Sequence, residues 1–172
     1  DDGIDDLVIG AHYETSEGLM AGAVYVFYGP LSGSSLSLLA ADHKLTGQSD
    51  GDGAGWDVAL MDADDDGADD LAIGAPYEST VGSESGAVYV LYGPLGSGDA
   101  PLADADLILT GEAAGDRAGY SVDGAGDVSD DGADDLVVGA PYEDTSGSDA
   151  GAVYLLLGPL GSGEETLADA DL

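Results

Sequence analysis

Short runs of apolar residues, separated by glycine-rich and acidic segments, recur along the chain. One type of run is dense in Val, Tyr and Leu and occupies residues 23–28, 87–92 and 152–157. A second type, rich in Leu, Ile and Val, occupies residues 7–11, 71–75 and 136–140. Runs of this length and composition, bounded by Gly, Ser and Asp, predict β-strands. Because several are apolar at every position, we expect neighbouring sheets to cover both faces of their sheets.

Two weaker runs complete each unit. A first strand is predicted at 55–61 and 119–125, and a fourth at 42–46 and 106–110. Leu107 and Leu109 alternate with other residues in the last run, which is the period of a half-buried strand. Segments rich in Gly and Ser are predicted to be turns, at residues 81–86, 96–99 and 161–163. The pattern predicts an all-β fold of four-stranded antiparallel sheets.

Three sequence motifs repeat at the same spacing. Asp-Asp-Gly-x-Asp-Asp-Leu begins at Asp1, Asp65 and Asp130, Gly-Ala-Val-Tyr at Gly22, Gly86 and Gly151, and Gly-Pro-Leu at Gly29, Gly93 and Gly158. The offsets are 64 and then 65 residues each time, so the 172 residues hold about 2.7 repeats. We divide the chain into 1–53, an incomplete repeat without its first strand plus a linker, 54–117, a complete repeat, and 118–172, a repeat whose last strand is truncated.

The incomplete repeats predict exposed strand edges. A bare edge is a template for pairing with another chain, and strand addition across chains is a known mode of assembly. We therefore expect self-association, either within a longer covalent array or head to tail. A head-to-tail contact forms a ring if its rotation closes and a filament if it does not.

An acidic turn precedes the second strand of each repeat. In the second repeat, acids at turn positions 1, 3, 5 and 9 surround a glycine at position 6. Oxygen ligands on alternate residues around a sharp turn suit Ca²⁺, which takes six to eight oxygens, better than octahedral Mg²⁺. The predicted ligands in this turn are Asp62, Asp64, Asp66, the Ala68 carbonyl and Asp70.

The other two turns follow the same pattern with changes. In the third repeat the predicted ligands are Asp127, Ser129, Asp131, the Ala133 carbonyl and Asp135. In the first repeat they are Asp2, the Ile4 carbonyl and Asp6, which is half a site. An EF-hand would place a Glu at position 12, where this chain has Ile73 and Val138 within predicted strands, so the turns connect strands rather than helices.

The charge excludes several classes of function. Two basic residues against 36 acidic ones give a net charge of −34, which excludes nucleic acid and anionic membranes as direct partners. No apolar run is long enough to insert into a membrane. The chain has no cysteine, so disulfides and thiolate metal sites are excluded.

Catalysis is not expected. The clustered acids recur with the repeat, and catalytic residues rarely occur in triplicate, whereas metal ligands in repeats do. The only two histidines, His12 and His43, occupy unrelated repeat positions. No Gly-x-Ser-x-Gly elbow is present. We predict that the chain is not an enzyme.

One family combines these elements. Gly-Trp-Asp-Val at Gly55, or Gly-Tyr-Ser-Val at Gly119, followed by the acidic turn and then Asp-Leu-Ala-Ile-Gly-Ala-Pro at Asp70, resembles the FG-GAP repeat of integrin alpha-chain β-propellers. Trp56 and Tyr120 stand where the family usually has Phe, and His12 replaces Pro in the first copy. The resemblance implies propeller-type blades and a calcium-dependent extracellular or cell-surface role in adhesion or scaffolding.

Two alternatives remain open at the sequence level. The blades could belong to a propeller that binds an extracellular protein or glycan on its loops. They could also form a non-catalytic accessory domain of a secreted hydrolase, because family members are appended to enzymes.

Overall fold

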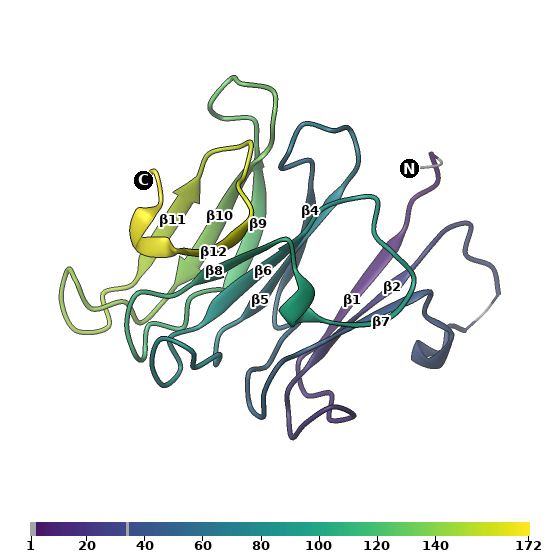
Figure 1. Cartoon of the computed structure of the whole chain (residues 1–172), viewed down its shortest axis with the longest axis horizontal. Coiled ribbons are helices and arrows are strands. Elements are labelled where there is room, and N and C mark those ends of the chain that lie inside the picture. Colours follow the sequence, from purple (N-terminus) through teal and green to yellow (C-terminus); the bar gives the residue numbers. More distant parts are fainter. Residues whose placement is uncertain (1–2, 34) are drawn as a thin grey trace.

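The computed structural model describes residues 3–33 and 35–172, which form three β-sheets side by side (Figure 1). The first sheet has the order β1-β2-β3-β7, the second β12-β8-β6-β5-β4, and the third β11-β10-β9. Three short 3-10 helices, η1 (Leu38–Ala40), η2 (Leu102–Asp104) and η3 (Leu167–Asp169), are the helices of the described residues. The twelve strands are β1 (Leu7–Ala11), β2 (Ala23–Phe27), β3 (His43–Thr46), β4 (Val58–Met61), β5 (Asp70–Ala75), β6 (Ala87–Leu91), β7 (Gly98–Pro101), β8 (Leu107–Thr110), β9 (Ser121–Gly126), β10 (Asp135–Ala140), β11 (Ala152–Leu156) and β12 (Gly163–Thr166). The predicted all-β class is confirmed.

The central sheet is buried on both faces, as its continuous apolar runs predict. On one face, Leu71 and Ile73 pack with Val24 and Val26 of the first sheet. On the other face, side chains of β6 and β8 join those of β10 in the third sheet. All six residues of β5 are consequently buried. This burial holds the start of β5 in place, where the acidic turn of the second repeat ends.

The sheets contain an outer strand that the sequence pattern did not predict. β12 pairs in parallel with β8, and β7 pairs in parallel with β3. Each outer strand comes from the repeat that follows in sequence, so the central sheet has five strands instead of the expected four antiparallel ones. Residues 98–99 and 163, which were predicted to lie in turns, therefore belong to strands. Gly98–Pro101 and Gly163–Thr166 are mostly exposed and lack apolar alternation, which is why the pattern missed them.

Glycines bring the backbones of neighbouring sheets into contact. A Cβ added to Gly74 in β5 would lie 2.1 Å from the carbonyl oxygen of Gly119, just before β9. The same relation holds between Gly10 in β1 and Gly55, where the distance is 2.2 Å. The glycine of the Ile-Gly-Ala motif is therefore required by the spacing of the sheets.

The ends of the described chain lie on opposite sides of the molecule (Figure 1). β1 is one of the two edge strands of the first sheet, and its partner within that sheet is β2. Beyond β12, the Leu172 carbonyl accepts a hydrogen bond from the Leu155 amide of β11 at 2.9 Å. No helix of the described residues combines the length and apolar character needed to cross a membrane.

Candidate metal centre in the acidic turns

The turn of the second repeat joins β4 to β5 and is organised by its first aspartate. Asp62 Oδ1 accepts the Asp66 amide at 3.1 Å, and Asp62 Oδ2 accepts the Gly67 amide at 3.1 Å. Gly67 has φ +87°, a left-handed conformation that glycine adopts without a steric penalty. Asp65, at position 4, also has a positive φ of 63°. The sharp turn predicted around the position-6 glycine is present.

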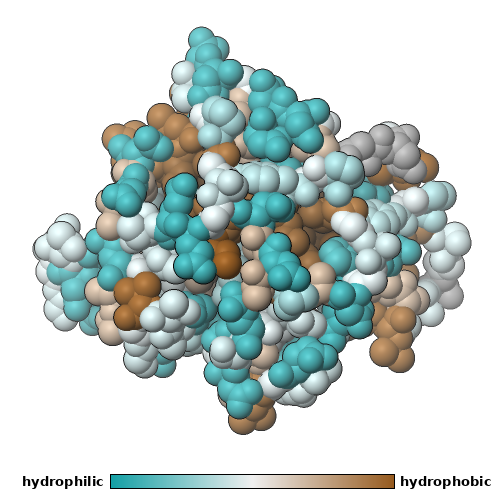
Figure 2. Space-filling model, in the orientation of Figure 1, coloured by the Kyte–Doolittle hydropathy of each residue, from teal (hydrophilic) through white to brown (hydrophobic). Residues whose placement is uncertain are grey.

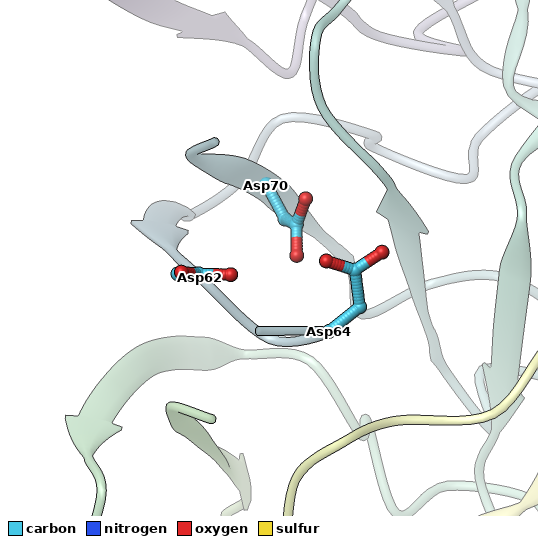
Figure 3. A group of neighbouring side chains, drawn as sticks. All are labelled: Asp62, Asp64 and Asp70. Atoms are coloured by element: carbon cyan, nitrogen blue, oxygen red, sulfur yellow. The ribbon is translucent and has the colours of Figure 1, made fainter. Parts of the chain in front are cut away.

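Three of the predicted ligands converge in this turn. Asp62, Asp64 and Asp70 offer carboxylate oxygens that all lie within 4.8 Å of one another, and Figure 3 shows them facing a common space. The fourth predicted carboxylate, Asp66, is not in this group, and its Oδ1 accepts the Ala68 amide at 2.7 Å. Ala68 is buried, and its carbonyl stays a predicted ligand.

Asp70 anchors the turn to the central sheet. It is fully buried, its Oδ2 accepts the Ala63 amide at 2.8 Å, and its Oδ1 accepts the Gly93 amide at 2.7 Å. Burial raises the pKa of Asp70, the charges of Asp64 and Asp62 raise it further, and the two backbone hydrogen bonds oppose the shift. Keeping Asp70 ionised therefore costs free energy, and a nearby cation would reduce that cost.

The third turn repeats this internal bonding. Asp127 Oδ1 accepts the Asp131 amide and its Oδ2 accepts the Gly132 amide, both at 3.0 Å. Asp135 Oδ1 accepts the Gly158 amide at 2.7 Å, as Asp70 does with Gly93. Within the described residues, the carboxylates of this turn do not form a close group like that of the second turn. Ala133 is buried, and its carbonyl also stays a predicted ligand.

Ser129, at position 3 of the third turn, has a buried hydroxyl group. Its Oγ is buried and has no hydrogen-bond partner among the described residues. A buried hydroxyl without a partner is unfavourable, and a cation beside it would use the free oxygen lone pairs. This observation fits the predicted role of Ser129 as a ligand.

The first turn is described only in part. Asp2 lies outside the described residues. Gly3 has φ +83°, and Asp6 Oδ1 accepts the Gly29 amide at 2.8 Å, which repeats the anchoring contact of the other two turns. Ile4 is exposed, and its carbonyl stays a predicted ligand.

The donor set fits a hard divalent cation. Three carboxylates close together repel one another, and carboxylate oxygens are the ligands that Ca²⁺ and Mg²⁺ prefer. Neither basic side chain of the protein offsets this charge. Lys44 pairs with Glu14 at 3.5 Å, and Arg117 pairs with Glu84 at 2.5 Å.

A second set of acids, which the sequence reasoning missed, is buried beyond the other end of β5. Glu78 and Asp52 are 7% and 4% exposed, and the corresponding residues one repeat length later, Glu143 and Asp116, are 6% and 3% exposed. These residues recur with the repeat spacing, which is a signal that could have identified them. Their isolation in the sequence, away from the acid-rich turns, concealed them.

The geometry defines a class of protein: tandem β-sheet repeats in which an acidic turn, suited to binding a cation, joins the first two strands of a repeat. Residues 54–91 and 118–156 each match the family described as "FG-GAP repeat". The resemblance predicted from the sequence is confirmed, and the two segments are FG-GAP repeats.

Curated relatives of two kinds match the chain. Chicken integrin alpha-6 is 35% identical over 108 residues, or 61% of this chain, and Xenopus laevis integrin alpha-5 is 31% identical over 169 residues, or 94% of it. Bovine phosphatidylinositol-glycan-specific phospholipase D is 34% identical over 166 residues, or 88% of this chain. The chain spans only 10%, 14% and 18% of the lengths of these three relatives.

Proposed function

We propose that this chain is a calcium-binding segment of an extracellular structural or adhesion protein, built of propeller-type blades. The convergence of Asp62, Asp64 and Asp70 between two strands of a buried sheet carries the proposal. The FG-GAP repeats and the integrin alpha relatives support the adhesive class and the extracellular location. We assign no catalytic role to the chain.

The turn residues contact several strands, so an ion bound by them would hold these strands rigidly together. Asp62 follows β4, Asp70 begins β5, and the contact of Asp70 with Gly93 reaches the segment that follows β6. The main chain of Asp62 also meets the third turn, because the Asp134 amide donates to the Asp62 carbonyl at 2.7 Å. When Ca²⁺ is bound, it supplies the charge that cancels carboxylate repulsion. The protein residues then hold three strands and a neighbouring sheet in one arrangement.

A second candidate function is a non-catalytic accessory domain of a secreted hydrolase. The match to phospholipase D over 88% of this chain favours it. Both candidates use the same calcium-dependent blades, and ligand binding on the loops by an extracellular protein or glycan is compatible with either. Self-association through strand edges also stays a prediction. Hydrolase activity in the full-length native protein would select the second candidate.

Calcium binding is tested by counting bound ions with native mass spectrometry. The double substitution of Asp62→Asn and Asp64→Asn should remove one tightly bound Ca²⁺ per chain, because it neutralises two of three convergent ligands. Asp104→Asn, on the exposed side of η2, removes one exposed carboxylate and should leave the count unchanged. An unchanged count in the double variant would contradict a site in this turn.

A further inference from the structure

A buried pair of carboxylates lies at the end of β5 remote from the acidic turn. Asp70 begins β5, whereas Glu78 follows its last residue, Ala75, so the strand separates the two places by roughly 20 Å. We propose that Asp52 and Glu78 hold a hard cation between them, at a site separate from the acidic turns. The site is independent of the calcium centre proposed above.

Glu78 presents an oxygen that no protein group satisfies. Its Oε1 accepts hydrogen bonds from the Thr80 amide, at 2.8 Å, and from the Thr80 hydroxyl. Its Oε2 is buried and has no hydrogen-bond partner among the described residues, while the whole side chain is more than nine-tenths buried. Leaving a buried carboxylate oxygen unpaired is strongly unfavourable in the absence of a counter-charge.

Asp52 lies beside the segment that carries Glu78, because the Tyr77 amide donates a hydrogen bond to the Asp52 carbonyl at 3.3 Å. Asp52 Oδ2 accepts the Ser49 amide at 2.8 Å. Burial raises the pKa of Asp52 to about 6, against the Ser49 hydrogen bond, and the charge of Glu78 adds to the rise. Burial also raises the pKa of the Tyr89 hydroxyl, and the charges of Glu78 and Asp52 raise it further. Two acids and a phenol therefore lie within electrostatic reach of one another, away from water.

In the first repeat, a lysine side chain lies beside the glutamate that corresponds to Glu78. Glu14 corresponds to Glu78 in the repeat, and Lys44 Nζ lies 3.5 Å from Glu14 Oε1. Lys44 is also 5.6 Å from the ring centroid of Tyr25, its partner in the β2–β3 register. An ammonium group thus balances the glutamate where the chain supplies one.

The second repeat has an isoleucine where the first has this lysine. Ile108 is the register partner of Tyr89, as Lys44 is of Tyr25. Both basic residues of the protein are engaged elsewhere, with Glu14 and Glu84. The counter-charge for Asp52 and Glu78 must therefore come from solution.

The available ligands define the cation. Two carboxylates and the Tyr89 hydroxyl, which accepts a hydrogen bond from Gln48 Nε2 at 3.2 Å, are all oxygen donors. Oxygen ligands select a hard ion such as Ca²⁺ over a soft one. One repeat length later, Asp116 and Glu143 occupy the corresponding positions, and Glu112 replaces Gln48 and accepts the Tyr154 hydroxyl at 2.9 Å. A single proton shared by Asp52 and Glu78 is the competing state.

The decisive experiment replaces the ion with an ammonium group. Ile108→Lys recreates the Lys44 arrangement in the second repeat, and Glu78→Gln removes one ligand. Native mass spectrometry in CaCl₂ counts the ions, and circular dichroism verifies the fold. Each variant should lose one Ca²⁺ per chain relative to wild type, while Glu17→Gln, at an exposed glutamate, should lose none. Ile108→Lys should also melt at the wild-type temperature or above.

The turn variant keeps this test separate from the calcium centre. Combining Glu78→Gln with Asp62→Asn and Asp64→Asn should remove two ions, one from each place. If only the turn substitutions fail to change the count, the proposed function fails and the buried site stands. An unchanged ion count in a folded Ile108→Lys or Glu78→Gln variant would overturn the buried site and assign the pair to a shared proton.

Discussion

Asp70 combines a charge with a backbone-anchoring role, and the two can be separated by substitution. Its carboxylate accepts hydrogen bonds from the amides of Ala63 and Gly93, the first buried and the second partly buried. Asp6 and Asp135 make the equivalent contact with Gly29 and Gly158. The ninth turn position therefore requires an acceptor for structural reasons even before a cation is considered.

Asp70→Ala should lower the free energy of unfolding by about 3 kcal/mol in calcium-free buffer, because one buried amide and one partly buried amide lose their acceptor. Asp64→Asn, at a half-buried ligand without this anchoring role, should cost much less under the same conditions. Urea denaturation with a chelator present measures both values. Equal losses in the two variants would contradict the anchoring role of Asp70.

At the residue scale, the sequence predicted the three carboxylates that converge in the second acidic turn, while their role as metal ligands stays a prediction. Asp62, Asp64 and Asp70 converge as the spacing indicated. The place of Asp66 outside the group could not be predicted, because it depends on a local hydrogen bond to the Ala68 amide. Asp52 and Glu78 were missed because burial decides their importance, and burial depends on how neighbouring sheets pack.

At the scale of elements, apolar runs predicted the central strands and turn residues predicted their boundaries. Leu7–Ala11 was predicted at its observed bounds, and Ala87–Leu91 to within one residue. The outer strands β7 and β12 were not predicted, because pairing with the preceding repeat defines them. An exposed Gly-Glu-Glu-Thr segment has no strand signal of its own.

Gly74→Ala tests whether the sheets depend on their close backbone contact. The added Cβ would lie 2.1 Å from the Gly119 carbonyl oxygen, so the sheets must move apart. We expect a loss of about 1–3 kcal/mol in unfolding free energy, the range for overpacked cores. Gly96→Ala is the matched control, because its Cβ would meet nothing within 4 Å and should change stability by less than about 0.5 kcal/mol. Urea denaturation of both variants gives the comparison, and a neutral Gly74→Ala would contradict it.

At the scale of the whole molecule, the main feature is the large negative net charge. A net charge of −34 makes the folded state repel itself, and Figure 2 shows hydrophilic side chains over much of the visible face. Screening by simple salt weakens repulsion between exposed charges, with a Debye length of about 8 Å at physiological ionic strength. Buried groups such as Asp70 and Glu78 are screened far less. The two contributions can therefore be distinguished.

Calcium should stabilise the protein beyond any effect of ionic strength. A ligand that binds only the folded state adds about 2.7 kcal/mol per site at a hundredfold excess over its Kd. The melting temperature should therefore be clearly higher in CaCl₂ than in NaCl of equal ionic strength with a chelator. The variant carrying Asp62→Asn and Asp64→Asn should lose part of this difference, since one site is removed while the buried pair remains. Differential scanning calorimetry measures each transition. Identical melting temperatures in the two salts would mean that screening alone offsets the charge, and that the acidic turns have no structural requirement for calcium.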